Sequence, residues 1–144
     1  MIDVTVSTKI NRSADVVFAY MSNIANAPSW RTDVMEVSQT SAGPIGAGAT
    51  FHLRMKPAMG VSEADLEVAE CKPNTKLVLT INFGRFKSTH TGQFTAAGEA
   101  TIYTEQIQVS MGGLMRLIEP LAKGMVRRSN ARVLENLKHV LEQG

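Results

Sequence analysis

The sequence predicts an α+β protein in which an antiparallel sheet packs against one long C-terminal helix. From about residue 33 to residue 109, apolar and polar residues alternate in short runs separated by turns that contain Gly, Pro or Asn. This alternation is typical of the strands of an antiparallel meander. From Gly112 to Gly144, apolar residues instead recur every three or four positions, which is the spacing of one helix face. A chain of 144 residues suits one domain, so we expect residues 1–144 to form a single unit.

The N-terminal part is expected to form one strand and two short helices. Residues 4–10 alternate between apolar and polar side chains, as in a half-buried strand. Ser13 suits the N-cap of a first helix that ends near Ser22, because its hydroxyl can accept a bond from the first turn. A second short helix is expected over residues 23–27. Pro28 should stop it, since the residue before a proline is pushed out of helical geometry.

Six further strands and the terminal helix complete the expected order of elements. The glycine-rich segment 43–49 lacks a following Lys-Ser or Lys-Thr pair and a helix, so it favours a turn over a phosphate-binding loop. Pro120 has no amide hydrogen, and the helix is expected to kink or restart there. With Gly124 close by, residues 117–128 should be the segment most able to move. The expected strands cover residues 33–39, 50–56, 61–71, 77–83, 86–96 and 100–109.

Composition argues against several classes of function. The net charge is only +2, and the basic residues gather on the terminal helix without a nucleic-acid-binding motif, so nucleic acid is not expected as a partner. No run is long enough for stable membrane insertion, and the first residues lack a signal-peptide pattern. Cys71 is the sole cysteine, which indicates a cytoplasmic protein without an intramolecular disulfide. Cys71 and the three histidines show no metal-ligand spacing, so we expect no metal and no cofactor.

Five segments resemble the polyketide cyclase/dehydrase family of the START/Bet v 1-like (SRPBCC) superfamily. The resemblance spans essentially the whole chain, and it implies a helix-grip fold. In that fold, a curved seven-stranded antiparallel sheet surrounds a long C-terminal helix, and two short helices follow strand one. The family implies a cavity between sheet and helix that holds lipids, sterols, polyketides or other apolar molecules. The segments are INRSADVVFAYMS (10–22), NAPSW (26–30), GPIGAGATF (43–51), TGQFTAAGEATIYTEQI (91–107) and RRSNARVLENLKHVLE (127–142).

The expected cavity wall follows from strand alternation and from the apolar face of the helix. Trp30 could close the mouth of the cavity or anchor the second short helix to the sheet, and both interpretations stay open. The mouth itself, and any gating, is expected beside Leu121, Gly124 and Met125, where the helix can leave room. The candidate ligand-binding residues are Trp30, Phe51, Leu53, Met55, Leu66, Leu79, Ile81, Phe83, Phe94, Leu121, Gly124 and Met125.

Polar residues on the same inner face are the candidates for chemistry. His90 shares a strand face with Phe86 and Phe94, and Glu105 lies between Tyr103 and Ile107. Because the two strands form a hairpin, His90, Glu105 and Tyr103 could look into one pocket and transfer protons to a carbonyl or hydroxyl substrate. The alternative is a buried polar cluster that satisfies its own hydrogen bonds. His52 and His139 are expected at the surface.

Three classes of function are therefore carried forward. The leading hypothesis is binding of a small hydrophobic molecule between the sheet and the helix. The second is a polyketide cyclase or dehydratase that uses the polar residues of the cavity for acid-base chemistry. The third is an interaction module without a small ligand, which uses either the basic face of the terminal helix or a homodimer surface.

Overall fold

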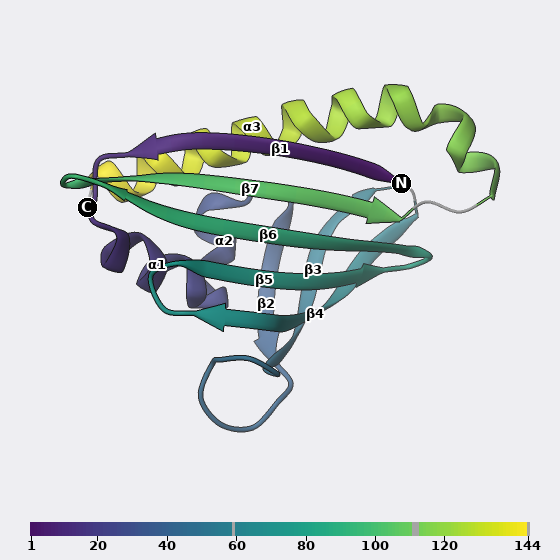
Figure 1. Cartoon of the computed structure of the whole chain (residues 1–144). Helices are drawn as coiled ribbons and strands as arrows, with labels where there is room; N and C mark the ends of the chain where they lie inside the picture. The colour runs from purple at the N-terminus through teal and green to yellow at the C-terminus, as the bar shows by residue number, and fades with distance from the viewer. Residues whose placement is uncertain (59, 111–112, 144) are drawn as a thin grey trace.

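Seven strands and a long C-terminal helix make up most of the protein, as Figure 1 shows. The computed structural model describes residues 1–58, 60–110 and 113–143. The strands are β1 (Ile2–Ile10), β2 (Val34–Gln39), β3 (Thr50–Ala58), β4 (Val61–Lys72), β5 (Lys76–Phe83), β6 (Phe86–Ala97) and β7 (Ala100–Ser110). The helical elements are α1 (Ala14–Ser22), η1 (Ile24–Asn26), α2 (Ala27–Trp30), η2 (Gly113–Ile118) and α3 (Glu119–Gln143), of which η1 and η2 are 3₁₀ helices.

All neighbouring strands pair antiparallel in the order β1-β7-β6-β5-β4-β3-β2. Strands β2 to β7 follow one another as a meander, and β1 joins the free side of β7, so β1 and β2 form the two edges. Gly84 and Gly98 have positive φ angles of 60° and 66° in the β5–β6 and β6–β7 turns, a backbone region that glycine adopts without a steric penalty. The expected α+β architecture is therefore confirmed.

Helix α3 runs alongside β1 and in the same direction (Figure 1). At one end, the amino group of Met1 lies 2.7 Å from a Glu119 carboxylate oxygen. At the other end, Lys138 Nζ donates to the carbonyl of Lys9 at 2.6 Å, and the amide of Asn11 donates to Glu142 Oε2 at 2.8 Å. These contacts fix both ends of the helix against the β1 edge of the sheet.

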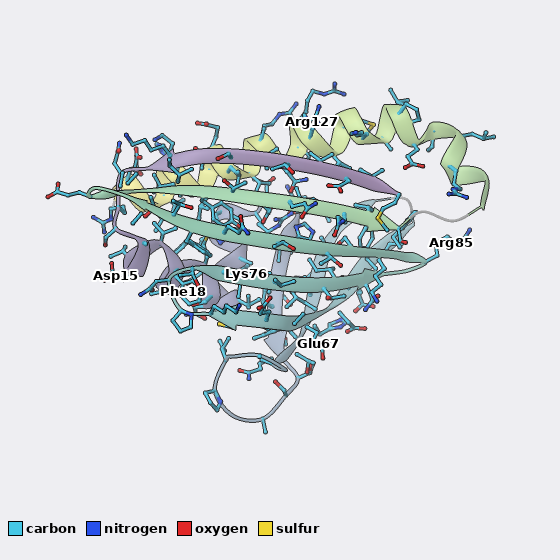
Figure 2. The ribbon with its side chains drawn as sticks, viewed as in Figure 1. Asp15, Phe18, Glu67, Lys76, Arg85 and Arg127 are labelled. Carbon is cyan, nitrogen blue, oxygen red and sulfur yellow. The ribbon has the colours of Figure 1, made fainter. Side chains whose placement is uncertain are left out.

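The two halves of α3 differ in burial. Val133, Leu134, Leu137 and Leu141 are buried in the hydrophobic core, while Leu121 is 68% exposed. The N-terminal half therefore contributes little to the core, whereas the C-terminal half closes it. Charged side chains such as those of Glu67 and Arg127 lie on the outer surface (Figure 2).

The helices near Pro28 and Pro120 begin and end differently: the boundary expected at Pro28 is absent, and the one expected near Pro120 is present. The expectation that Pro28 stops a helix is wrong, because Pro28 lies in the first turn of α2, where the missing amide hydrogen costs nothing. Near Pro120 the backbone changes from the 3₁₀ helix η2 to the α-helix α3, which begins at Glu119, in agreement with a helix that restarts. Among the helices in the described part of the chain, none is both long and apolar enough to cross a membrane.

Candidate functional site

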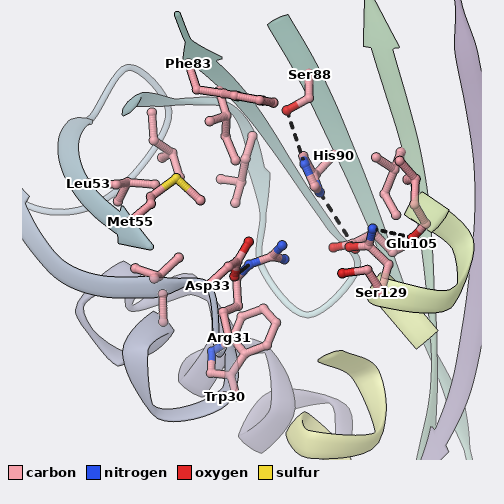
Figure 3. A pocket seen from close by; sticks show the side chains of 18 of the residues that line it. Trp30, Arg31, Asp33, Leu53, Met55, Phe83, Ser88, His90, Glu105 and Ser129 are labelled. Atoms are coloured by element: carbon pink, nitrogen blue, oxygen red, sulfur yellow. Dashed lines mark hydrogen bonds and ion pairs between the residues drawn. The ribbon is translucent and has the colours of Figure 1, made fainter. Parts of the chain in front are cut away.

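A cavity of about 400 Å³ lies between the inner face of the sheet and α3. Its wall is mainly apolar, and its volume falls in the range usual for small-molecule sites. Met125 lines the cavity and is also 58% exposed, so the cavity reaches the surface beside this residue. Eight of the predicted ligand-binding residues line it, namely Trp30, Leu53, Met55, Leu66, Leu79, Ile81, Phe83 and Met125. Figure 3 shows several of these side chains around the pocket.

Four other predicted ligand-binding residues lie outside the cavity wall. Phe51 is 2% exposed and belongs to the packed core. Phe94 fills space between Phe18 and Tyr103, with ring centroids 5.2 and 5.0 Å away. Leu121 points to solvent. A Cβ atom added at Gly124 would meet only the Arg128 guanidinium, at 3.6 Å. Of the three residues beside which the mouth was expected, Leu121, Gly124 and Met125, Met125 lines the cavity and the other two do not.

The polar candidates from the β6–β7 hairpin do meet in the cavity. Tyr103 Oη donates to Glu105 Oε1 at 2.9 Å, and His90 Nδ1 lies 3.7 Å from Glu105 Oε2. On its other side, His90 Nε2 is 3.3 Å from the hydroxyl of Ser88. Figure 3 shows His90 between Ser88 and Glu105. The residues thus form a chain of polar groups, and its widest gap separates His90 from Glu105.

Gly92 makes room for this arrangement. It pairs with Glu105 across the hairpin, two pairs away from the Phe94–Tyr103 pair. A Cβ atom at residue 92 would lie 2.5 Å from Tyr103 Oη and 2.8 Å from Tyr103 Cε1, which is closer than atoms can approach. The absence of a side chain therefore lets the Tyr103 ring lie across β6.

The charge states of Glu105 and Tyr103 follow from burial and from their neighbours. Burial by itself would raise the pKa of the Glu105 carboxyl, but His90, and to a smaller extent Arg31 and Tyr103, outweigh it and lower the pKa below its ordinary value of 4.5. Burial first, and then the negative charge of Glu105, raise the pKa of Tyr103 well above 10.0. At neutral pH, Glu105 is therefore an ionised acceptor and Tyr103 a protonated donor.

Sequence reasoning missed several polar or small residues of the site, among them Arg31, Asp33, Asn130 and Gly92. Arg31 and Asp33 line the cavity as an ion pair, with Arg31 Nε 3.4 Å from Asp33 Oδ1, and their loop carries no periodic signal. Asn130 lines it from α3; its position between Val126 and Val133 on the apolar helix face was a usable signal. Gly92 could be recognised only through the strand register, because its effect depends on a residue of another strand.

The arrangement offers acid-base groups and hydrogen bonds. Within residues 1–58, 60–110 and 113–143, no cluster of three or more His, Cys, Asp or Glu side chains could hold a metal ion. His52 lies on the outer face of the sheet, where it contacts Asp65 and Glu63, and His139 is exposed on α3. Neither lines the cavity. The polar side chains available for chemistry in the cavity are those of Arg31, Asp33, Lys56, Ser88, His90, Tyr103, Glu105, Ser129 and Asn130.

A seven-stranded antiparallel sheet, two short helices after the first strand and a long C-terminal helix define the Bet v 1-like helix-grip class. More specifically, the chain belongs to the family described as polyketide cyclase / dehydrase and lipid transport, whose model matches residues 1–142. The family resemblance inferred from the sequence is thereby confirmed. Comparison with curated protein sequences gives no match.

Solved structures with the same fold include proteins of different kinds. A conserved protein from Geobacillus kaustophilus has a TM-score of 0.81 at 12% identity, covering 98% of this chain and 95% of its own. A START superfamily protein from Mycobacterium smegmatis has a TM-score of 0.74 at 13% identity, covering 98% and 97%. The Zhui aromatase/cyclase from Streptomyces sp. R1128 has a TM-score of 0.73 at 11% identity, covering 98% and 93%. At such low identity these similarities show the fold alone.

Proposed function

We propose that this protein binds a small hydrophobic molecule in the cavity between the sheet and α3. The observation that carries the proposal is a cavity of about 400 Å³ with a largely apolar wall, a combination typical of small-molecule sites. A packed core of this size would ordinarily close such a space, because voids larger than a water molecule are few in protein interiors. The family's description, which includes lipid transport, also supports ligand binding.

Native mass spectrometry of the purified protein tests this proposal directly. We expect either a co-purified small molecule or, after its removal, a rise in Tm with at least one class of apolar ligand, because a ligand that binds only the folded state stabilises it. Fatty acids, sterols, flavonoids and polyketides form a suitable panel. No added mass and no rise in Tm with any class would contradict the proposal.

A second candidate function is acid-base catalysis of the cyclase or dehydratase type. It is favoured by the convergence of His90, Glu105 and Tyr103 on one cavity, and the name of the Zhui aromatase/cyclase shows that this fold hosts such a protein. His90 would take or give the proton of a substrate carbonyl or hydroxyl. Glu105 would stabilise the imidazolium that forms, and the Tyr103 phenol would donate to a developing oxyanion. The gap of 3.7 Å between His90 and Glu105 would have to tighten around the substrate.

Turnover of a poly-β-ketone mimic, followed by liquid chromatography and mass spectrometry, tests the catalytic candidate. We expect His90→Asn to lower kcat by about 100-fold or more while the Kd changes little, because general acid-base catalysis usually contributes about that factor. Product formation at the rate of buffer alone, or an unchanged kcat in the variant, would rule out this role. The cytoplasmic location and the homodimer alternative stay predictions from the sequence.

A further inference from the structure

Three residues of the cavity wall each have a buried polar atom that lacks a hydrogen-bond partner. Glu105 and Asn130 are 4% and 7% exposed, and both line the cavity. Glu105 Oε2 and Asn130 Oδ1 are buried atoms without a hydrogen-bond partner, and so is Asp33 Oδ1, which faces Arg31. Among the described residues that line the cavity, the buried atoms left in this state are all acceptors.

The chemistry of the neighbouring groups fixes Glu105 Oε2 and Asn130 Oδ1 as acceptors. Asn130 Nδ2 donates to the carbonyl oxygen of Val126 at 2.8 Å. Because a carbonyl can only accept, the amide cannot flip, and Oδ1 must be the atom left free. Tyr103 occupies Glu105 Oε1 at 2.9 Å, whereas His90 Nδ1 stays 3.7 Å from Oε2, beyond hydrogen-bond distance.

Unpaired buried acceptors are costly, since each has lost its hydrogen bonds to water. A ligand that brings a donor to them would recover that free energy, whereas a ligand that brings only acceptors would not. A charged ligand group would also lose its hydration on entering the cavity. A carboxylate would in addition be repelled by Glu105, and the attraction of an ammonium group to Glu105 is opposed by the cations Arg31 and Lys56, which line the same cavity. A neutral hydroxyl group meets none of these penalties of charge.

We propose that the ligand is a neutral, hydroxyl-bearing apolar molecule whose hydroxyl group donates a hydrogen bond to Glu105 Oε2 or to Asn130 Oδ1. This inference rests on the proposed ligand-binding function and specifies its ligand class. The two acceptors come from opposite walls of the cavity, Glu105 from β7 and Asn130 from α3. A ligand with two hydroxyl groups can therefore bridge sheet and helix, while its apolar body lies against the Leu and Ile side chains of β3 to β5.

Isothermal titration calorimetry with four naphthalene derivatives tests the preference, since they share one apolar body and differ in one substituent. We expect 2-naphthol to bind about tenfold more tightly than 2-methoxynaphthalene, which keeps the oxygen but cannot donate. We expect 2-naphthoate and 2-naphthylmethylamine to bind more weakly than 2-naphthol. An ether that binds as tightly as the naphthol, or a carboxylate or amine that binds more tightly, would overturn the inference.

Substitutions of Glu105 and Asn130 test whether these two residues cause the preference for a hydroxyl group. In Glu105→Gln, Oε1 can keep its hydrogen bond from Tyr103, so an NH₂ donor replaces the free acceptor Oε2. We therefore expect the preference for 2-naphthol over 2-methoxynaphthalene, measured as the ratio of their Kd values, to fall to about threefold or less. Asn130→Ala should lower the ratio as well. Glu67→Gln makes the same chemical change on the outer surface and should leave both Kd values unchanged. A ratio unaffected by both cavity variants would overturn the assignment of the acceptors.

The outcomes separate this inference from the proposed function. If no derivative binds, including the ether, the ligand-binding function itself is contradicted for ligands of this size. If all four bind with similar Kd values, ligand binding stands and the hydroxyl preference is overturned. Because the ligand series is measured on the unmodified protein, a variant that fails to fold leaves the test decisive.

Discussion

Residue 92 decides where the Tyr103 side chain can lie. Any side chain larger than hydrogen at this position would overlap the phenol, since a Cβ atom would come within 2.5 Å of its oxygen. The hydrogen bond from Tyr103 to Glu105 therefore depends on a glycine in a neighbouring strand. Glycine inside a strand is often a sign of such a close approach.

We predict that Gly92→Ala displaces the Tyr103 ring and lowers the free energy of unfolding by about 1–3 kcal/mol, the usual cost of overpacking a buried site. Urea denaturation measures the change. Gly124→Ala is the matched control: nothing but the Arg128 guanidinium lies near its added Cβ atom, and alanine favours a helix by about 0.5–1 kcal/mol. A stabilising or neutral Gly92→Ala would show that the ring can move without cost.

For single residues, strand alternation predicted which polar side chains share the inner face of the sheet, and the structure brings His90, Tyr103 and Glu105 into one cavity. Alternation could not predict the register of neighbouring strands or the distances between side chains. Phe94 shows the limit: it was expected to line the cavity, yet it is buried between Phe18 and Tyr103. Whether an inward residue meets a ligand or another side chain depends on contacts between distant segments.

Among the elements, α3 combines two functions along its length. Its C-terminal half buries Leu134 and Leu137 in the core, whereas its N-terminal half lies over the cavity and leaves Leu121 and Met125 exposed. Periodicity predicted one long helix with an almost continuous apolar face. It could not show which half of the helix packs against the sheet, because apolar residues repeat every three or four positions in both halves.

The same substitution in the two halves of α3 should have very different effects. We predict that Leu137→Ala lowers the free energy of unfolding by about 2–5 kcal/mol, because Leu137 is 0% exposed and its loss leaves a cavity. Leu121→Ala should change it by less than about 0.5 kcal/mol, since Leu121 lies largely in solvent. Chemical denaturation of both variants measures the contrast. Equal losses would mean that the N-terminal half also packs against the core.

Strands β3 and β4 are linked on their outer face by a pH-dependent contact. His52 Nδ1 lies 3.0 Å from Asp65 Oδ1, and Nε2 lies 3.2 Å from Glu63 Oε1. The bond to Asp65, followed by the bond to Glu63, raises the pKa of His52 above its ordinary value of 6.5. A raised pKa means that the folded state binds the proton more tightly than the unfolded state.

The sign of the pH effect follows from that shift. The stabilisation by His52 is fully present below pH 6.5 and is lost as the pH rises through the higher pKa of the folded state. We therefore predict that His52→Gln lowers Tm at about pH 5.5 and has a smaller effect at about pH 8.5. Because the groups are exposed, the difference should also shrink at high salt. A Tm difference that grows with pH would contradict this explanation.

At the scale of the whole molecule, the space between sheet and helix is filled at one end and open at the other. Side chains of α1, α2 and the C-terminal half of α3 pack together near one end of the sheet, where the chain also ends (Figure 1). The order of elements and the family resemblance predicted this architecture, including a cavity. The mouth was expected beside Leu121, Gly124 and Met125, but which of these residues meets the cavity depends on how far the sheet curves away from α3.

Adding a large side chain in the cavity wall and adding one in the packed core should have different effects on Tm and on ligand binding. We predict that Ile81→Phe, in the cavity wall, leaves Tm unchanged or raises it, because the larger side chain enters existing space. It should weaken binding of 2-naphthol by about tenfold or more, because the ring occupies the volume that a ligand needs. Leu137→Phe adds a similar ring to the filled core, where overpacking costs about 1–3 kcal/mol. Differential scanning calorimetry with and without 2-naphthol measures both effects. If the two substitutions lowered Tm equally, the cavity would not be a space that a ligand can occupy, and the proposed function would lose its main support.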